Sequence, residues 1–385
     1  MSLKYKIVYY TENTMVTIFE TGCVDIISAI YHSAVNSAGS LTFMLDPYHI
    51  AYNAIETLKG IVALYKNDKL IFKSRIYSIT IDDYNIKTVE CEGLLAILND
   101  SIIKSYTYDE YHSLDGSKST QKFGNWIYQL SNNHNQQVTE ETHFFDVEMS
   151  DELRNLDFVC KNTSYTDTWS EIKSKFINEL NGFLWVEYGN NILTTEGDVL
   201  HFDMALSKKC NQEIKYAVNL SSIERKICVD DFATAILPLG GEYENEAGDK
   251  VKTSIASVNN NNEYLINAEA VKKYGRINKA INFDGVLSPT ELLKLAKNKL
   301  EEILSLSGSL SIKAVDLSIN DNKLDSFEVG QKVKVISENH QTDMFAVISE
   351  FEMNLLKPQA TEYKLNSEFK SFVNSTNQKI YKIGE

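Results

Sequence analysis

The densest group of potential metal ligands in the chain lies in the segment EETHFFDVE, residues 140–148. It contains one imidazole and four carboxylates, from Glu140, Glu141, His143, Asp146 and Glu148. Imidazole nitrogens and carboxylate oxygens are common zinc ligands. The segment also has an alternating pattern around Phe144, Phe145 and Val147, which is typical of a strand with one face in a core and a charged face in water. The pattern therefore favours a strand over a metal site.

Two acidic pairs could support hydrolysis of a glycosidic bond, which requires two carboxyl groups that flank the scissile bond. They are Asp82 with Asp83, and Glu90 with Glu92. Charged residues are ordinary in surface turns and on outer strand faces, and this is the simpler interpretation of both pairs. Cys91 lies between the two glutamates, and no neighbouring residue in the sequence indicates an activated thiolate.

The sequence contains no Walker loop and no G-x-G-x-x-G, H-E-x-x-H or G-x-S-x-G motif. Gly240 and Gly241 follow Pro238 closely and indicate a turn rather than a phosphate-binding loop. The seven histidines lie far apart in the sequence. We therefore assign no catalytic, cofactor-binding or metal-binding residue, and we expect no cofactor and no enzymatic activity.

The charge of the chain argues against general binding to nucleic acids. The formal net charge is −15, and the acidic residues are spread along the whole chain. Nucleic-acid binding requires basic patches that displace counterions from the phosphates. The small basic cluster of Lys272, Lys273, Arg276 and Lys279 is most simply a solvated face.

Cysteine usage and apolar content indicate a globular protein made in the cytosol. The five cysteines are scattered with no C-x-x-C pair, which favours buried, reduced thiols. Apolar residues make up 43% of the chain, but no window approaches the roughly 20 consecutive apolar residues of a membrane span. The amino terminus lacks the apolar core of a signal peptide, so we expect neither a membrane anchor nor export.

The elements that must position these residues are mostly strands in the first hundred positions. Tyr5, Ile7 and Tyr9 alternate in one strand, and residues 41–45 alternate in another. Between them, the apolar positions 26, 27, 30, 31, 34 and 35 have helical spacing and predict a short amphipathic helix. Together these elements predict a small barrel or sandwich.

Two later segments are predicted to be helices. Residues 168–182 begin with Thr168 and Glu171, the spacing of a capping box, and Gly182 is placed to end the helix. The second helix follows Ser288 as its cap, with Pro289 at the first helical position. Its apolar face runs from Leu292 to Leu304 at helical spacing, and Gly308 lies beyond its end.

A strand pair occurs twice in the sequence, beginning at Gly60 and again at Gly330. In the second strand of each pair the apolar residues are spaced by three and then by two: Ile76, Ile79 and Ile81 in the first copy, and Ile348, Phe351 and Met353 in the second. A three-residue step breaks the two-residue period of a strand and therefore predicts a β-bulge or a change of the buried face. Two half-buried hairpins can look alike without common origin, but the shared step makes duplication a serious hypothesis.

An ordered series of segments resembles the tail-associated "prophage endopeptidase tail" proteins of phages and prophages. The series includes NSAGSLTFML, VECEGLLAILNDS, LNGFLWVEYGNN, ATAILPLGGEY and FEVGQKVKVISENHQTD, and extends from about residue 3 to residue 370. The resemblance implies a fold similar to the central hub of contractile-phage baseplates. Such hubs are trimers in which two related barrels per chain form a pseudo-sixfold ring.

The resemblance implies a β-rich α+β fold with two related small β-barrel domains, a mixed α/β domain and a helical insertion. We expect the following parts: a first barrel over 1–104, a mixed α+β domain over 105–209, a second barrel over 210–255 and 308–370, an inserted helical segment over 256–307 and a C-terminal extension over 371–385. The hydrolase module that gives the family its name is expected to be absent, because the chain stops at Glu385.

The resemblance predicts a structural hub that adapts a sixfold tail tube to a threefold spike or fibre. The implied partners are two further copies of the chain, the tail tube or distal tail protein, the tape measure protein and a spike or fibre protein at the tip. The expected location is the tail tip of a virion assembled in the bacterial cytoplasm. A tail-associated peptidoglycan hydrolase remains an alternative, because of the family name and the acidic pairs. A receptor-binding protein is a third, because 21 tyrosines could stack on sugars, although core packing explains dispersed tyrosines equally well.

Overall fold

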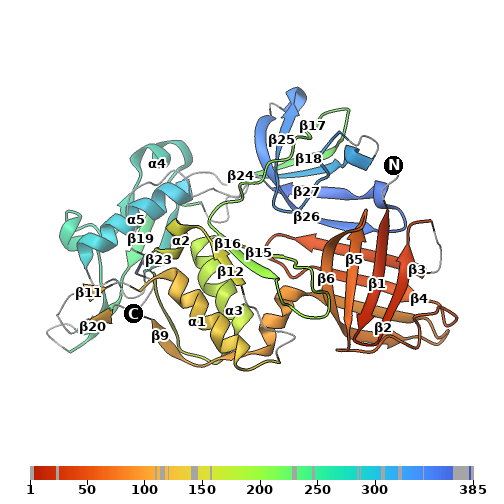
Figure 1. Cartoon of the computed structure of the whole chain (residues 1–385). Helices are drawn as coiled ribbons and strands as arrows, with labels where there is room; N and C mark the ends of the chain where they lie inside the picture. The colour runs from red at the N-terminus through yellow and green to blue at the C-terminus, as the bar shows by residue number, and fades with distance from the viewer. Residues whose placement is uncertain are drawn as a thin grey trace.

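The computed structural model shows a large, curled antiparallel sheet together with two smaller α/β units (Figure 1). It describes residues 4–22, 26–108, 111–112, 118–119, 121–139, 146–156, 158–227, 232–244, 248–283, 286, 288–304, 308–319, 323–340, 342–366 and 381–382. Within these residues, no helix is both long enough and apolar enough to cross a membrane. The prediction of a β-rich α+β fold is confirmed.

The first half of the large sheet is formed by the amino-terminal strands. They are β1 (Tyr5–Thr11), β2 (Thr14–Glu20), β3 (Ile26–Ala34), β4 (Ser40–Leu45), β5 (Ile61–Lys66), β6 (Lys69–Ile81) and β7 (Lys87–Gly93). Their order in the sheet is β2-β1-β5-β6-β7-β4-β3, and every neighbouring pair is antiparallel. The predicted alternation in β1 is confirmed, because Tyr5, Ile7 and Tyr9 are all buried.

The second half of the sheet is formed by later strands. They are β17 (Ile214–Lys215), β18 (Leu220–Ile227), β24 (Gly308–Val315), β25 (Lys332–Ser337), β26 (Thr342–Asn354) and β27 (Glu362–Asn366). Their order is β18-β24-β27-β26-β25, with the short β17 parallel to β25. Strand β26 also pairs with β3, which joins both halves into one sheet over a shared hydrophobic core.

The two half-sheets contain the same five-strand pattern. In the first half, the five strands β3 to β7 lie in the order β3-β4-β7-β6-β5 across the sheet. If the strands are numbered 1 to 5 along the chain, this order is 1-2-5-4-3. Strands β18, β24, β25, β26 and β27 have the same order and are also antiparallel throughout. The repeated hairpin consists in both copies of a six-residue strand followed by a 13-residue strand.

The predicted bulges are present at matching places in both copies. The register of β6 against β7 shifts between Ile76 and Ser78, and the register of β26 against β27 shifts between Ile348 and Glu350. The two glycines that precede the hairpins, Gly60 and Gly330, both have positive φ, at 66° and 86°. The three-residue apolar step in the sequence therefore reports an extra residue in the strand.

The predicted helix around residues 26–35 is wrong, because this segment is strand β3. The register of β3 against β4 shifts between Ile26 and Ser28, so the buried residues are Ile26, Ala29 and Tyr31. These buried positions are spaced by three residues and then by two, and over so short a segment this resembles the spacing of one helix face. Because β3 pairs with β4 on one side and β26 on the other, the sheet and not the local pattern decides its conformation.

A mixed α/β unit follows β7 and has its own hydrophobic core. Its elements are η1 (Leu94–Asp100), β8 (Ile102–Ile103), β9 (Tyr106–Tyr108), β10 (Tyr111–His112), β11 (Lys118–Ser119), α1 (Phe123–Asn135), β12 (Asp146–Met149), α2 (Asp151–Arg154), β13 (Phe158–Asn162), β14 (Thr166–Asp167), α3 (Thr168–Ile172), η3 (Lys173–Asn178), β15 (Phe183–Glu187) and β16 (Val199–Asp203). Strands β12, β16 and β15 form a three-stranded sheet that covers one side of this core. Strand β13 also pairs with β28 (Tyr381–Lys382).

The helix at residue 168 exists, but its predicted ends are wrong. Asp167 is the N-cap, and its Oδ1 accepts the N–H of Ser170 at 2.7 Å. Glu171 does not close a capping box, because its buried carboxylate accepts the hydroxyl of Tyr106 at 2.6 Å. At the other end Asn181, and not Gly182, has the positive φ of 55°.

A third, smaller unit lies between β18 and β24. It contains β19 (Ala235–Leu239), β20 (Glu242–Glu244), β21 (Lys250–Lys252), η4 (Ala256–Val258), β22 (Leu265–Ile266), α4 (Ala268–Tyr274), β23 (Asn278–Asn282) and α5 (Pro289–Leu304). The predicted helix start is confirmed, since Ser288 Oγ accepts the N–H of Glu291 at 3.4 Å. Short 3-10 helices connect strands of the second half-sheet at η5 (Leu317–Ile319), η6 (Glu338–His340) and η7 (Pro358–Ala360).

Candidate functional site

The structure describes only part of the predicted metal cluster. Glu140, Glu141 and His143 lie outside the described residues. Asp146 and Glu148 are on β12 and are exposed, whereas Val147 between them is buried, so the predicted strand with a charged outer face is confirmed here. In the described part of the chain, no group of three or more acidic, histidine or cysteine side chains is arranged to hold a metal ion.

Glu148 instead belongs to a row of side chains across the outer face of the β12-β16-β15 sheet. Its Oε2 is 3.5 Å from Nδ1 of His201 on β16, and His201 Nε2 is 3.1 Å from Oε2 of Glu187 on β15. The Nε2 contact is short but lacks hydrogen-bond alignment. The His201 ring stacks on Trp185, with centroids 5.2 Å apart and planes 5° apart. Four residues from three strands thus form a polar and aromatic surface, and the only sign of it in the sequence is the alternation within each strand.

One member of each acidic pair makes an ordinary structural contact, and the two pairs are not brought together. Asp82 accepts the backbone N–H groups of Tyr84 and Ile86 in the exposed β6–β7 turn. Glu92 forms an ion pair with Arg75 at 2.7 Å, and this pair lies on the same two strands but several residues away from the turn. Glu90 pairs with Ser78, three residues before the end of β6 at Ile81. A strand rises about 3.3 Å per residue, so the turn lies roughly 10 Å or more from Glu90.

Two buried nucleophiles in the chain are inaccessible to a substrate. Ser101 Oγ lies 2.7 Å from His134 Nδ1, but both residues are fully buried and the Ser101 hydroxyl also contacts Thr168 at 2.6 Å. Cys91 is fully buried in the first half-sheet, and burial raises the pKa of its thiol. Both therefore contribute to packing and hydrogen bonding in a core.

The other candidates from the sequence also have structural explanations. The N–H groups of Gly240 and Gly241 donate to the carbonyl oxygens of Thr253 and Val286, so they are not free to hold a phosphate. The basic residues Lys272, Lys273 and Arg276 are exposed on and after α4. These placements agree with a turn and a solvated face.

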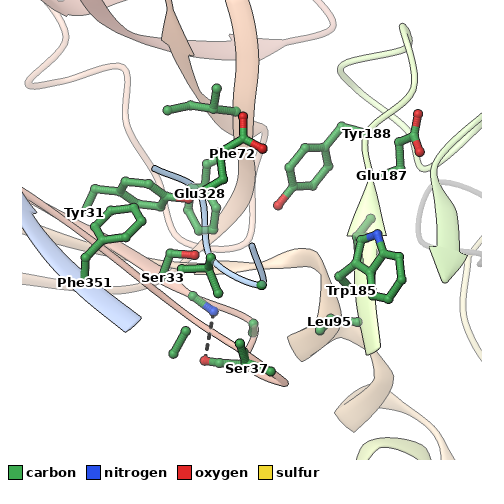
Figure 2. Close-up of a pocket in the computed structure, with 18 of the residues that line it drawn as sticks. Tyr31, Ser33, Ser37, Phe72, Leu95, Trp185, Glu187, Tyr188, Glu328 and Phe351 are labelled. Carbon is green, nitrogen blue, oxygen red and sulfur yellow. Dashed lines mark hydrogen bonds between the residues drawn. The ribbon is translucent and has the colours of Figure 1, made fainter. Parts of the chain in front are cut away.

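A cavity of about 620 Å³ lies where the two half-sheets meet the α/β unit. One wall consists of three aromatic rings from three strands: Tyr31 of β3 is 5.1 Å from Phe72 of β6 and 5.4 Å from Phe351 of β26, measured between ring centroids. Figure 2 shows Trp185 and Tyr188 on the opposite wall. The cavity therefore depends on both half-sheets and on β15.

The α/β unit is attached to the first half-sheet by a buried ion pair. Lys73 of β6 and Asp198 are both fully buried, and Nζ lies 2.7 Å from Oδ2. The ammonium also donates to the carbonyl oxygens of Asn191, at 2.8 Å, and of Thr194. Burial lowers the pKa of Lys73, and the carboxylate opposes this effect. All three N–H groups of the ammonium therefore have acceptors on the loop 191–198.

Exposed apolar side chains gather at one end of the first half-sheet. The β4–β5 connection carries Tyr48, Ile50 and Leu58, and the β6–β7 turn carries Tyr84. The two segments are adjacent, because the Tyr52 hydroxyl donates to the carbonyl oxygen of Asn85 at 2.7 Å. Exposed apolar clusters of this kind are typical of surfaces that contact another protein.

Comparison with known proteins identifies relatives of this architecture. Residues 208–376 match the family model described as "Prophage endopeptidase tail". No curated protein matches the sequence significantly. Among solved structures, the tail protein from Neisseria meningitidis MC58 superposes with a TM-score of 0.58 at 12% identity, covering 94% of this chain and 97% of that one.

Two further solved structures are similar over nearly their whole length. The 43 kDa tail protein of prophage MuSo2 from Shewanella oneidensis has a TM-score of 0.57 at 9% identity, covering 94% of this chain and 97% of that one. The prophage tail protein gp18 from Listeria monocytogenes EGD-e has a TM-score of 0.53 at 14% identity, covering 96% of both chains. The chain therefore has the fold of these tail proteins.

Proposed function

We propose, from the match of residues 208–376 to the prophage endopeptidase tail family, that this chain is a structural component of a phage tail tip or baseplate. In this proposal the chain is the central hub, a homotrimer that adapts a sixfold tail tube to a threefold spike or fibre. The particle is a phage tail or a phage-derived bacteriocin, and the chain enters it during assembly in the host cytoplasm.

The internal repeat is the observation that carries the hub proposal. Each chain presents two five-strand units with one strand order, and they lie side by side through the pairing of β3 with β26. Three such chains around an axis would present six similar units in a ring. The two half-sheets would then correspond to the two related barrels that the family resemblance implies. A ring of this kind can bind a sixfold tube on one side and a threefold protein on the other.

The acidic charge supports a position around a channel through which DNA passes. The net charge of −15 repels a polyanion rather than binding it. The proposed partners are accordingly proteins: the tail tube or distal tail protein, the tape measure protein and a spike or fibre protein. The exposed side chains of Tyr48, Ile50, Leu58 and Tyr84 offer one apolar surface for such a contact.

Native mass spectrometry tests the proposed assembly. The expected species has three times the mass of one chain, either alone or with the tube or distal tail protein added. Electron microscopy of that complex should show a ring with three-fold symmetry and six similar lobes. A stable monomer that also fails to bind the tube and distal tail proteins would refute the hub proposal.

We propose that the chain acts without catalysis. Asp82 holds the β6–β7 turn and Glu92 is in an ion pair with Arg75, so one member of each acidic pair already has a structural partner. Zymography on Gram-positive cell walls should give no clearing with the purified chain. Clearing that disappears in Glu90→Gln or Glu92→Gln would instead establish a peptidoglycan hydrolase.

A further inference from the structure

The cavity between β15 and the junction of the half-sheets has the chemistry of a ligand site that the hub proposal does not require. We propose that it binds a short, uncharged oligosaccharide. Its volume of about 620 Å³ lies within the roughly 300–1,000 Å³ that is usual for ligand pockets. The inference does not depend on the oligomeric state of the chain.

Aromatic side chains line the cavity on two sides, and most of their exposed surface belongs to Trp185 and Tyr188. Tyr31, Phe72 and Phe351 form one wall, and Trp185 with Tyr188 forms the other (Figure 2). The side chain of Trp185 remains 38% exposed, although a tryptophan is among the most costly residues to leave in water. One face of its indole is covered by the His201 ring. The remaining indole surface offers a stacking platform for the apolar C–H face of a sugar ring.

Hydroxyl groups supply the polar part of the cavity. Tyr31, Tyr188 and Ser33 line it. The Tyr31 oxygen already interacts with Ser33 and the Tyr188 oxygen with the Lys73 backbone, and each phenol keeps its own O–H to donate. Burial raises the pKa of Tyr31 to about 12 and raises that of Tyr188 as well, so both phenols are neutral donors at physiological pH. Sugar hydroxyls can both donate and accept hydrogen bonds, so they complement this lining.

The charged side chains that line the cavity are nearly balanced in sign, which argues against a strongly ionic ligand: there are three ammonium groups, of Lys66, Lys69 and Lys208, and two carboxylates, of Glu187 and Glu328. Glu328 forms an ion pair with Lys208, so these two charges offset each other. Lys66 donates to the Ser326 hydroxyl, and Lys69 is exposed at the end of its strand. A charged ligand of either sign would meet side chains of its own sign here, whereas a neutral ligand leaves the Glu328–Lys208 pair intact.

Binding is tested with neutral trisaccharides on the complete chain in its native assembly. Maltotriose, cellotriose and tri-N-acetylchitotriose are the neutral probes, and tri-galacturonic acid and the glucosamine trimer are charged probes of equal length. Saturation-transfer NMR detects binding, and tryptophan fluorescence gives Kd. At least one neutral trisaccharide is expected to bind and to be preferred over both charged probes.

Two variants test whether the sugar binds in the cavity. Trp185→Ala is expected to weaken binding about tenfold or more, and Tyr188→Phe about three- to tenfold, from the loss of a stacking face and of one hydrogen bond. Tyr84→Ala is the matched control, because this aromatic residue is exposed in the β6–β7 turn, outside the cavity, and its loss should leave Kd unchanged. Far-ultraviolet circular dichroism verifies that each variant is folded.

Three results would overturn the inference. They are absence of binding by every neutral trisaccharide, tighter binding of a charged probe, and an unchanged Kd in folded Trp185→Ala. Co-sedimentation with amylose, cellulose or chitin distinguishes a site for polymer chains from a site for free sugars, and either source supports the site. Since the oligomeric state is measured separately by native mass, failure here leaves the hub proposal intact.

Discussion

The buried pair of Lys73 and Asp198 allows a quantitative test of how the α/β unit is held on the first half-sheet. The carboxylate accepts from the ammonium at 2.7 Å through Oδ2 and from the Gly189 N–H at 2.7 Å through Oδ1. Replacing Lys73 with Met keeps an unbranched side chain that is one atom shorter and removes the charge. Asp198 then remains buried as an anion with one donor, and the carbonyl oxygens of Asn191 and Thr194 lose theirs.

The expected cost follows from the removal of one partner of a buried ion pair, which destabilises proteins by about 3–5 kcal/mol. Asp198→Asn leaves the ammonium buried with a weaker acceptor and should destabilise as well. The double variant should lose less stability than the sum of the two single variants, by about 1–3 kcal/mol, because neither residual charge is then left without a partner.

Urea unfolding monitored by tryptophan fluorescence is the assay, since Trp126 and Trp185 both lie in the α/β unit. Limited proteolysis should show faster cleavage within residues 189–198 in Lys73→Met. The control is Lys59→Met, which removes an exposed ion pair with Glu56 and should not shift the unfolding midpoint measurably. If Lys73→Met shifts the midpoint no more than this control, the ion pair does not hold the unit in place.

Three further predictions follow from single positions. Gly60→Ala should destabilise the protein more than Gly248→Ala in thermal unfolding. Both glycines have positive φ, but only at Gly60 would an added Cβ overlap a backbone atom, the carbonyl oxygen of Tyr10. Equal effects of the two substitutions would contradict this explanation. Burial raises the pKa of Tyr31 from its ordinary value of 10.0 to about 12, so the unfolded chain loses this proton first as pH rises. Stability should therefore fall by about 2–3 kcal/mol between pH 10 and pH 12, and Tyr31→Phe should reduce that fall in urea titrations at each pH. Asp167→Ala should lower the free energy of unfolding by about 1 kcal/mol in the same assay, because α3 loses its N-cap. Unchanged stability would mean that Thr168, and not Asp167, is the effective cap.

Strand alternation and bulges were predictable from the sequence because they arise from the local period of side chains. The step of three residues in each repeated hairpin indicated a bulge or a change of face, and the register shifts at Ile76 and Ile348 show that it is a bulge. The start of α5 was equally predictable, because Ser288 and Pro289 act within one turn of the helix. The family resemblance was confirmed by the match over residues 208–376.

The same local reasoning failed where distant partners decide. Residues 26–34 have a spacing that a bulged strand and a short helix share, and pairing with β4 and β26 selects the strand. Glu171 has the position of a capping-box residue, but the hydroxyl of Tyr106 at 2.6 Å gives its buried carboxylate another partner. In both cases a contact far along the chain outweighs a local preference of about 1 kcal/mol.

The sequence by itself determined the repeated hairpins, their bulges and the β-rich character of the chain, because each depends on residues that are close in the chain. Only the tertiary structure decided that β3 pairs with β26, that Lys73 meets Asp198, and that Tyr31 faces Trp185 across a cavity. These contacts join residues more than a hundred positions apart, and nothing in the local period of a strand specifies which distant strand or loop it will meet. The repeat in the sequence thus became two half-sheets of one sheet, and the residues that surround the candidate site were assembled only by folding.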